Sequence, residues 1–289
     1  MDRFNGLGGK VITLGEMLID FVPEAAGDHK TTLDEIHPSH REHPMACAFI
    51  PKPGGAPANV AACVAILGGQ SAFIGKRGKD GFGDMLLNAL GQSGVDTTYF
   101  TETEEANTAL AFVSWNETGD RSFLFYRQPS ADMLLEHSQL PFEALSIAGV
   151  LHVGSISLIA EPAKSATLQA VQHARRAGVF VSYDPNWRPA LWADEDTGLR
   201  EMASLYPWCD LIKVNREEAD LLAPEGTLAE KAAYWHEQGI PYVIITLDRD
   251  GCYYSFQSTF QNMSKPVVLS GNIAGIPVQC VDTTGAGDS

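Results

Sequence analysis

Strand-like and helix-like segments alternate along the second half of the sequence, and this alternation restricts the fold more than any other feature. An apolar run at 149–158 precedes a helical pattern at 160–178, and a second strand-like run follows at 179–186. A single helix is expected at 198–209, then a strand at 210–215, helices at 216–224 and 227–239, and a strand at 241–248. Strands joined by helical connections pair in parallel and are covered on both faces. The pattern predicts an α/β fold whose doubly wound, mostly parallel sheet carries helices on both faces.

The first half extends this sheet and also interrupts it. The run "KVITLGEMLIDFV" (10–22) begins as a buried strand, and "PGGAPANVAACVAILGG" (53–69) predicts a turn followed by a helix. Two strand-like runs, 108–115 and 121–127, flank a polar turn and predict a hairpin. We expect one domain over 1–289, with a small β lid formed from about 20–53 and 107–128. The last strand expected is "IPVQCVD" (276–282).

Charge and composition exclude several classes of protein. The net charge of −16 over 289 residues argues against a nucleic-acid or anionic-membrane partner. A local anion site remains compatible with it, because backbone N–H groups bind phosphate without basic side chains. No run approaches the length of a membrane span, and the first ten residues do not resemble a signal peptide. The five scattered cysteines form no CxxC pair, so we predict a cytoplasmic protein with reduced thiols.

The stretch "VDTTGAGDS" (281–289) has the composition of an anion-binding turn. Gly285, Ala286 and Gly287 carry almost no side chain, so their backbone N–H groups can converge on one anion. Asp288 beside them would accept a proton from a hydroxyl that attacks phosphorus. The alternative is a tight turn with an N-capping aspartate. "GQSAFIGKR" does not match a Walker A loop, and no strand is followed by a dinucleotide fingerprint, which excludes a nicotinamide dehydrogenase.

Seven stretches together carry a family resemblance that runs from about Lys10 to Ser289. They are "GEMLIDF", "PGGAPANVA", "FYRQPSADMLL", "GSISL", "SYDPNWRPALW", "VNREEADLL" and "VDTTGAGD". In this order they resemble the ribokinase-like (PfkB) carbohydrate kinases, and within them the fructokinases most. The resemblance implies a ribokinase-like fold with a β lid over a sugar pocket. It also implies ATP and Mg²⁺ as cofactors, K⁺ as a further candidate, and a homodimer formed through the lid.

The resemblance implies a role for each matching residue. For sugar binding these are Asp20, Gly54, Gly55, Asn59, Arg127, Asn186 and Arg188, with Phe125 and Ala111 on the apolar wall of the lid. Taken singly, each could equally be a turn residue, a surface ion pair or part of the core. For nucleotide binding they are Asn215, Glu218, Thr246 and Gly251, with Glu218 holding Mg²⁺ through water and Asp282 a candidate for a monovalent cation. Asp248 departs from the family, which has glycine there, and is expected to crowd or repel a nucleotide phosphate.

The leading hypothesis is an ATP-dependent fructokinase that forms D-fructose 6-phosphate, with Asp288 as general base and the amides of Gly285, Ala286 and Gly287 around the transferred group. One rival is a related PfkB kinase for another sugar, such as 2-keto-3-deoxygluconate, because arginines also suit a carboxylate. Another is a non-catalytic sugar-binding form. Family members continue beyond the GAGD motif, so we expect the 289-residue chain to be C-terminally incomplete and poorly active.

Overall fold

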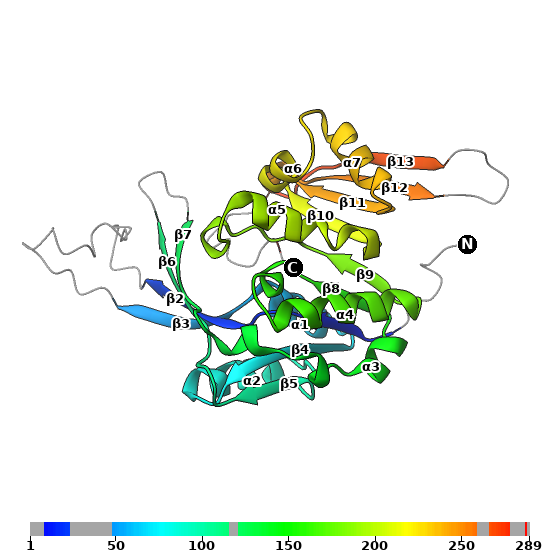
Figure 1. The fold of residues 1–289 in the computed structure, drawn as a ribbon. Helices are drawn as coiled ribbons and strands as arrows, with labels where there is room; N and C mark the ends of the chain where they lie inside the picture. The colour runs from blue at the N-terminus through cyan, green and yellow to red at the C-terminus, as the bar shows by residue number, and fades with distance from the viewer. Residues whose placement is uncertain (1–8, 24–47, 116–120, 259–265, 278–286, 288–289) are drawn as a thin grey trace, which may run out of the picture.

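The fold is that of a computed structural model, which describes residues 9–23, 48–115, 121–258, 266–277 and 287 (Figure 1). Within these residues two sheets occur. The larger has nine strands in the order β13-β12-β11-β10-β9-β8-β1-β4-β5, and the smaller has four in the order β3-β2-β6-β7. The predicted α/β class with a mostly parallel sheet is confirmed, because neighbouring strands from β5 to β11 are parallel and β12 and β13 are antiparallel.

The strands of the larger sheet are β1 (Val11–Leu14), β4 (Ser71–Gly78), β5 (Phe100–Thr103), β8 (Val150–Val153), β9 (Phe180–Tyr183), β10 (Leu211–Asn215), β11 (Tyr242–Thr246), β12 (Cys252–Ser258) and β13 (Val267–Ile273). The helices are α1 (Ala56–Ile66), α2 (Gly81–Gln92), α3 (Phe142–Ile147), α4 (Ala163–Arg176), α5 (Glu195–Ala203), α6 (Arg216–Leu222) and α7 (Leu228–Glu237). Helical segments cover both faces of this sheet (Figure 1).

Alternating side chains of β4 divide the interior into two hydrophobic clusters. Ala72 and Ile74 join the larger cluster, which includes buried residues of α4 and α7. Phe73, which lies between them in sequence, joins the smaller cluster together with buried residues of α1 and α2. Successive side chains of a strand point to opposite faces, so β4 has apolar packing on both sides. This two-sided burial explains why Ala72, Phe73 and Ile74 are all apolar and do not alternate with polar residues.

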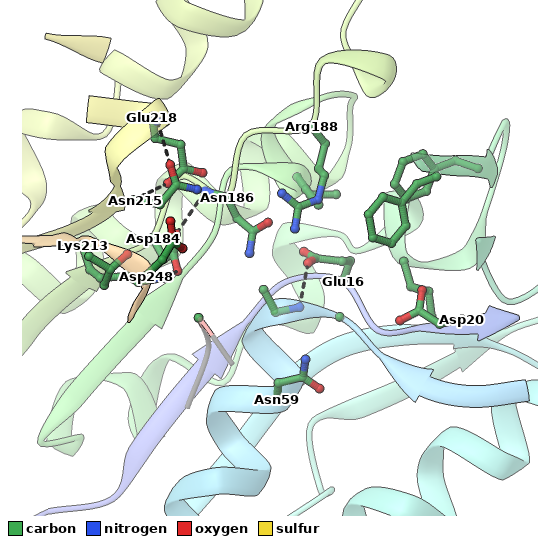
Figure 2. A pocket seen from close by; sticks show the side chains of 18 residues that line it. Glu16, Asp20, Asn59, Asp184, Asn186, Arg188, Lys213, Asn215, Glu218 and Asp248 are labelled. Carbon is green, nitrogen blue, oxygen red and sulfur yellow. Dashed lines mark hydrogen bonds and ion pairs between the residues drawn. The ribbon is translucent and has the colours of Figure 1, made fainter. Parts of the chain in front are cut away.

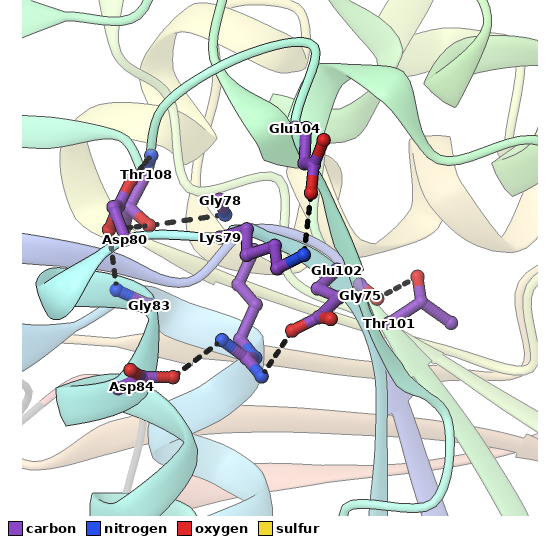
Figure 3. A network of polar contacts seen from close by, with 11 residues as sticks. Gly75, Gly78, Lys79, Asp80, Gly83, Asp84, Thr101, Glu102, Glu104 and Thr108 are labelled. Atoms are coloured by element: carbon purple, nitrogen blue, oxygen red, sulfur yellow. Dashed lines mark hydrogen bonds and ion pairs between the residues drawn. The ribbon is translucent and has the colours of Figure 1, made fainter.

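The smaller sheet joins β2 (Leu18–Pro23), β3 (Phe49–Gly54), β6 (Leu110–Trp115) and β7 (Arg121–Tyr126). The predicted hairpin is confirmed as the antiparallel pair of β6 and β7. A polar network anchors the beginning of β6 to the turn before α2 (Figure 3). Asp80 accepts hydrogen bonds from Thr108 N at 2.8 Å and from Gly83 N, the α2 N-cap bond, also at 2.8 Å. Through these bonds one carboxylate fixes the smaller sheet to the main body.

Two predicted elements differ from the structure. The single helix expected at 198–209 is α5 followed by a separate 3₁₀ turn, Tyr206–Trp208. Pro207 explains the break, because proline has no N–H for the helical ladder and clashes with the preceding turn. Of the strand expected at 276–282, residues 276 and 277 are not in a strand and the rest lie outside the described residues. The strand beyond β12 is instead β13, which the sequence reading did not anticipate.

Candidate functional site

A cleft of about 340 Å³ opens between the smaller sheet and the carboxyl ends of parallel strands in the larger sheet (Figure 2). Ligands of open α/β sheets bind at this edge, because the loops that follow the strands converge there. The cleft is lined by Glu16, Leu18, Asp20, Gly55, Ala56, Asn59, Phe123, Phe125, Ile156, Asp184, Asn186, Arg188, Lys213, Asn215, Glu218, Thr246, Asp248 and Gly287. Most of its polar residues fall into two groups on opposite sides, with Asn186 between them (Figure 2).

The first group, which we call the Glu16 end, consists of Glu16, Asp20, Asn59 and Arg188. Glu16 follows β1 and is 2% exposed, and its Oε1 accepts a hydrogen bond from Ala56 N at 3.2 Å. Oε2 has no hydrogen-bond partner among the described residues. Burial raises the pKa of Glu16 to about 7, against the lowering effect of the Arg127 charge. A substantial fraction of Glu16 is therefore protonated at neutral pH.

Arg188 faces the cleft from the segment after β9 (Figure 2). Its Nη1 donates a hydrogen bond to Trp187 O at 2.9 Å, and its Cζ lies 5.7 Å from the centre of the Phe123 ring. The ring supports the guanidinium through a cation–π contact, and its other N–H donors remain compatible with a ligand. Asp20, on β2, supplies a carboxylate at the same end.

The glycine pair before α1 is required by close packing. Gly55 has φ 112°, and a Cβ there would lie 2.6 Å from Glu16 O. A Cβ on Gly54 would overlap the carboxylate of Asp20. Any larger residue would displace the Glu16 backbone or the Asp20 side chain. The two glycines therefore shape the Glu16 end, although Gly54 itself does not line the cleft.

The second group, the Glu218 end, consists of Asp184, Lys213, Asn215, Glu218 and Asp248. Glu218 Oε2 accepts a hydrogen bond from Asn215 N at 2.9 Å, and Asn215 Oδ1 accepts one from Glu218 N at 2.8 Å. This reciprocal capping box begins α6. Glu218 Oε1 accepts a third bond from Trp187 N at 2.7 Å. Burial, followed by the nearby charge of Asp184, raises the pKa of Glu218.

An ion pair crosses the Glu218 end between neighbouring strands. Lys213 Nζ, on β10, lies 2.7 Å from Asp184 Oδ2, which follows β9. Asp184 Oδ1 accepts a hydrogen bond from Asn186 N at 3.1 Å. Lys213 also faces the glycine-rich motif, because a Cβ built on Gly287 would lie 3.4 Å from Nζ. A positive charge thus stands beside the one described residue of that motif.

The structure brings most of the described candidate residues together. Those that line the cleft are Asp20, Gly55, Asn59, Asn186, Arg188, Asn215, Glu218, Thr246 and Gly287, with Phe125 from the expected apolar wall. Gly54, Arg127 and Gly251 do not line it, and Ala111 is fully buried in a small cluster with Leu18 and Ala109. Asp282, Gly285, Ala286 and Asp288 lie outside the described residues.

Arg127 differs most from its expected position. It is 4% exposed and forms a buried ion pair with Asp132 in the 3₁₀ helix η3 (Ala131–Leu134), behind the cleft. Three polar lining residues were missed by the sequence reading: Glu16, Asp184 and Lys213. Asp184 and Lys213 lie at the carboxyl ends of predicted strands, and that position was the available signal. Glu16 lay within the quoted "GEMLIDF" stretch.

The carboxylates of the Glu218 end suit a hydrated divalent cation better than a direct metal cage. In the part of the chain that the structure describes, no three His, Cys, Asp or Glu side chains are grouped so that they could hold a metal ion. Both Glu218 oxygens already accept backbone N–H bonds. Magnesium keeps several waters and needs few protein ligands, so a water-mediated contact fits this donor set.

No helix in the described ranges is long and apolar enough to cross a membrane.

The sequence matches a protein family and several known proteins. The model for "pfkB family carbohydrate kinase" matches residues 9–289. Fructokinase-1 of Oryza sativa subsp. japonica is 43% identical, with 96% of this chain and 80% of that protein covered. Fructokinase-2 of Solanum lycopersicum is 41% identical, with 97% of this chain and 79% of that protein covered.

Solved structures similar to this fold also include fructokinases. A fructokinase from Xylella fastidiosa with bound ATP has a TM-score of 0.79 and 31% identity, covering 96% of this chain and 78% of that chain. A fructokinase from Vibrio cholerae O395, in a form with fructose, ADP and calcium ion bound, has a TM-score of 0.79 and 30% identity. It covers 98% of this chain and 81% of that chain.

Proposed function

Because the chain belongs to the pfkB family of carbohydrate kinases, we propose that it transfers the γ-phosphoryl group of ATP to the 6-hydroxyl of D-fructose. The observation that carries the proposal is the division of one cleft into two chemically different ends. The Glu16 end offers carboxyl, amide and guanidinium groups beside two phenylalanines, which suits a small polyol. The Glu218 end offers a lysine and backbone caps beside Gly287, which suits phosphates.

At the Glu16 end, Asp20 would accept hydrogen bonds from sugar hydroxyls and Arg188 would donate to sugar oxygens. This would hold the 6-hydroxyl toward Gly287, the described residue of the glycine-rich motif. Fixed orientation of the two reactants supplies much of the rate acceleration in phosphoryl transfer, because little covalent work is asked of the protein.

At the Glu218 end, the proton of the 6-hydroxyl would pass to the Asp288 carboxylate as the oxygen attacks the γ-phosphorus. The new O–P bond forms while the bond from the γ-phosphorus to the bridging oxygen breaks, and ADP leaves. Amides of Gly285, Ala286 and Gly287, with the Lys213 ammonium, would stabilise charge on the transferred group. Glu218 would hold water of a nucleotide-bound Mg²⁺, which supplies charge neutralisation, and Asp282 would help to bind K⁺.

The smaller sheet would act as a lid that excludes water as a competing acceptor. Among the described strands, β3 and β7 are its edges, so the same sheet would offer the homodimer contact. A cytoplasmic location also stays a prediction.

The test is ADP release by a chain extended past Ser289, with D-fructose, D-ribose, 2-keto-3-deoxygluconate and adenosine, followed by phosphorus NMR of the product. We expect turnover with fructose and a phosphate on its 6-hydroxyl. Replacing Asp288 with asparagine should lower kcat by about 10²- to 10⁴-fold, the usual contribution of a general base. The control is Asp196→Asn on α5, outside the cleft. Turnover with another sugar and none with fructose would disprove the substrate.

Two further candidates are each favoured by one observation. The guanidinium of Arg188 in the cleft also suits a sugar acid such as 2-keto-3-deoxygluconate. The carboxylate of Asp20 at the same end opposes a second negative charge, so fructose is the better fit. Asp248 in the cleft favours a non-catalytic sugar-binding form with weak ATP affinity. Calorimetry that detects fructose binding and no ATP binding would identify that form.

A further inference from the structure

A buried carboxyl oxygen of the cleft, Oε2 of Glu16, lacks a hydrogen-bond partner within the described residues. The side chain lies at the wall of the cleft, and the whole residue is 2% exposed. A buried polar atom without a partner costs free energy, which a ligand atom can recover. The oxygen is therefore a candidate ligand contact that the family motifs did not identify.

The surroundings of Glu16 determine which hydrogen-bonding role it can play. Behind it, Arg127 and Asp132 neutralise each other in their buried ion pair, and Ser130 Oγ donates to Asp132 Oδ1 at 2.5 Å. On the cleft side it shares its end with Asp20 and Arg188 (Figure 2). If Glu16 were ionised, two buried carboxylates, those of Glu16 and Asp132, would share the single charge of Arg127. Burial accordingly raises its pKa to about 7.

The position of the proton follows from the hydrogen bond at the other oxygen. Oε1 accepts from Ala56 N at 3.2 Å, so it must present a lone pair there. In the neutral acid the hydroxyl is then on Oε2, the oxygen without a partner. A carboxylic acid held in this way is a hydrogen-bond donor, whereas Asp20 at the same end is an acceptor when ionised.

We propose that Glu16 is a specificity-determining residue of the sugar subsite, whose Oε2 hydroxyl donates a hydrogen bond to an oxygen of the bound sugar. The inference rests on the proposed sugar-kinase function. A site built around a buried donor discriminates strongly against analogues that lack the matching oxygen, because the donor is then left unpaired. Arg127 does not line the cleft, and in this arrangement it is a positioning residue whose charge acts on Glu16.

The test is calorimetric titration of D-fructose without ATP, at about pH 6 and about pH 8.5. Fructose does not ionise in this range, and none of the lining residues is histidine or cysteine. Burial also raises the pKa of Glu218, but this residue lies at the other end of the cleft, and the Glu16 variants separate its titration from that of Glu16. The wild type should bind about tenfold more weakly at the higher pH, where loss of the Oε2 proton removes the donor. Glu16→Gln keeps an N–H donor that cannot titrate. It should bind about twofold to threefold more weakly than wild type at pH 6, with no further loss at pH 8.5.

Two more variants separate ligand contact from folding. Glu16→Met has a similar volume and no donor, and should bind fructose about tenfold more weakly at both pH values. Thr13→Val is the control, because Thr13 is fully buried, its Oγ1 also lacks a partner within the described residues, and it does not line the cleft. It should retain the wild-type pH dependence. Thermal unfolding of each variant at both pH values reports whether it is folded.

Each outcome bears on the proposal. Wild-type fructose affinity that is flat or improves with pH, or Glu16→Gln with the wild-type pH dependence, would overturn the role of Glu16 and leave the kinase function intact. If wild type binds another sugar and no fructose, the substrate is wrong and the same variants decide the role of Glu16 with that sugar. If it binds none of the sugars used in the kinase assay, the proposed function and this inference fail together.

Discussion

The two buried glutamates at opposite ends of the cleft have the same side chain and opposite hydrogen-bonding states. Glu218 accepts backbone N–H bonds at both oxygens, from Trp187 and Asn215. Glu16 accepts one, from Ala56, and its other oxygen has no partner in the described part of the chain. Burial raises the pKa of both. A carboxylate saturated in this sense, with a backbone partner at each oxygen, holds backbone segments together and keeps one lone pair per oxygen for water, whereas the unsaturated Glu16 leaves a whole oxygen available to a ligand.

The largest expected effect comes from replacing Glu218, the glutamate with a hydrogen-bond partner at both oxygens. Glu218→Ala leaves two backbone N–H groups, those of Asn215 and Trp187, without their acceptors. Each such loss costs about 1–3 kcal/mol, so we expect about 4 kcal/mol lower unfolding free energy in urea. Fructokinase turnover should also be lost, because the cap of α6 and the segment before Arg188 shift together. A loss below about 1 kcal/mol would show that Glu218 is not a structural brace.

The difference between the glutamates also explains what the sequence could predict. Glu218 and Asn215 are three residues apart, and the capping box they form is a local pattern. The environment of Glu16 is assembled from distant segments: Ala56 is 40 residues away and Arg127 is more than 100. Arg127 was expected at the substrate for a different reason: Asp132 is only five residues away, but spacing alone does not show that the two charges form a buried ion pair.

The fold was more predictable than the site because repeated local patterns determine it. Alternating strands and helices indicate the α/β class, and inner strands such as β11 carry consecutive apolar residues, Val243, Ile244 and Ile245. The failures have local physical causes. Pro207 divided a predicted helix, and β13, which has mostly exposed residues, lacks the apolar burial that marks the inner strands. The lid role of the smaller sheet stays a prediction.

The second expected effect concerns the pH dependence of stability and tests the unsaturated glutamate. The pKa of Glu16 is about 7 when folded and 4.5 as its ordinary value, so the folded protein binds more protons between these values. Its contribution to stability is therefore fully present below about pH 4.5 and is lost as pH rises through about 7, by about 3 kcal/mol in total. Glu16→Gln should remove this share of the slope in urea unfolding at about pH 5 and about pH 8. An unchanged slope would contradict the raised pKa.

The third effect tests whether the Glu218 end is the nucleotide end. Lys213→Met leaves the Asp184 carboxylate, whose side chain is 6% exposed, without its ion pair. We expect about 2 kcal/mol lower stability, because the pair is only partly buried, and about tenfold weaker ATP binding. Fructose affinity should not change. Lys164→Met is the control, because Lys164 pairs with Glu201 at 2.7 Å outside the cleft. Equal losses for ATP and fructose would remove the distinction between the two ends.

The smallest effect is expected at Asp248, an exposed residue of the Glu218 end with φ 50°. Substitutions there test whether this carboxylate weakens ATP binding. Its backbone conformation favours glycine, and its carboxylate faces a cleft end proposed to bind phosphates. Asp248→Gly relieves the left-handed conformation and increases the freedom of the unfolded chain, so stability should change by less than about 1 kcal/mol. Removal of one negative charge should tighten ATP binding about threefold, since exposed charges interact weakly.

Asp248→Asn separates these two contributions, because it removes the charge and keeps the Cβ. If the charge limits ATP affinity, Asn and Gly should give the same gain in calorimetry. If the Cβ crowds the nucleotide, only Gly should improve binding. Asp250→Asn is the matched control, because Asp250 belongs to the same 3₁₀ turn and does not line the cleft. A comparable gain from Asp250→Asn would mean that general surface charge, and not the position of Asp248, weakens ATP binding in this acidic chain.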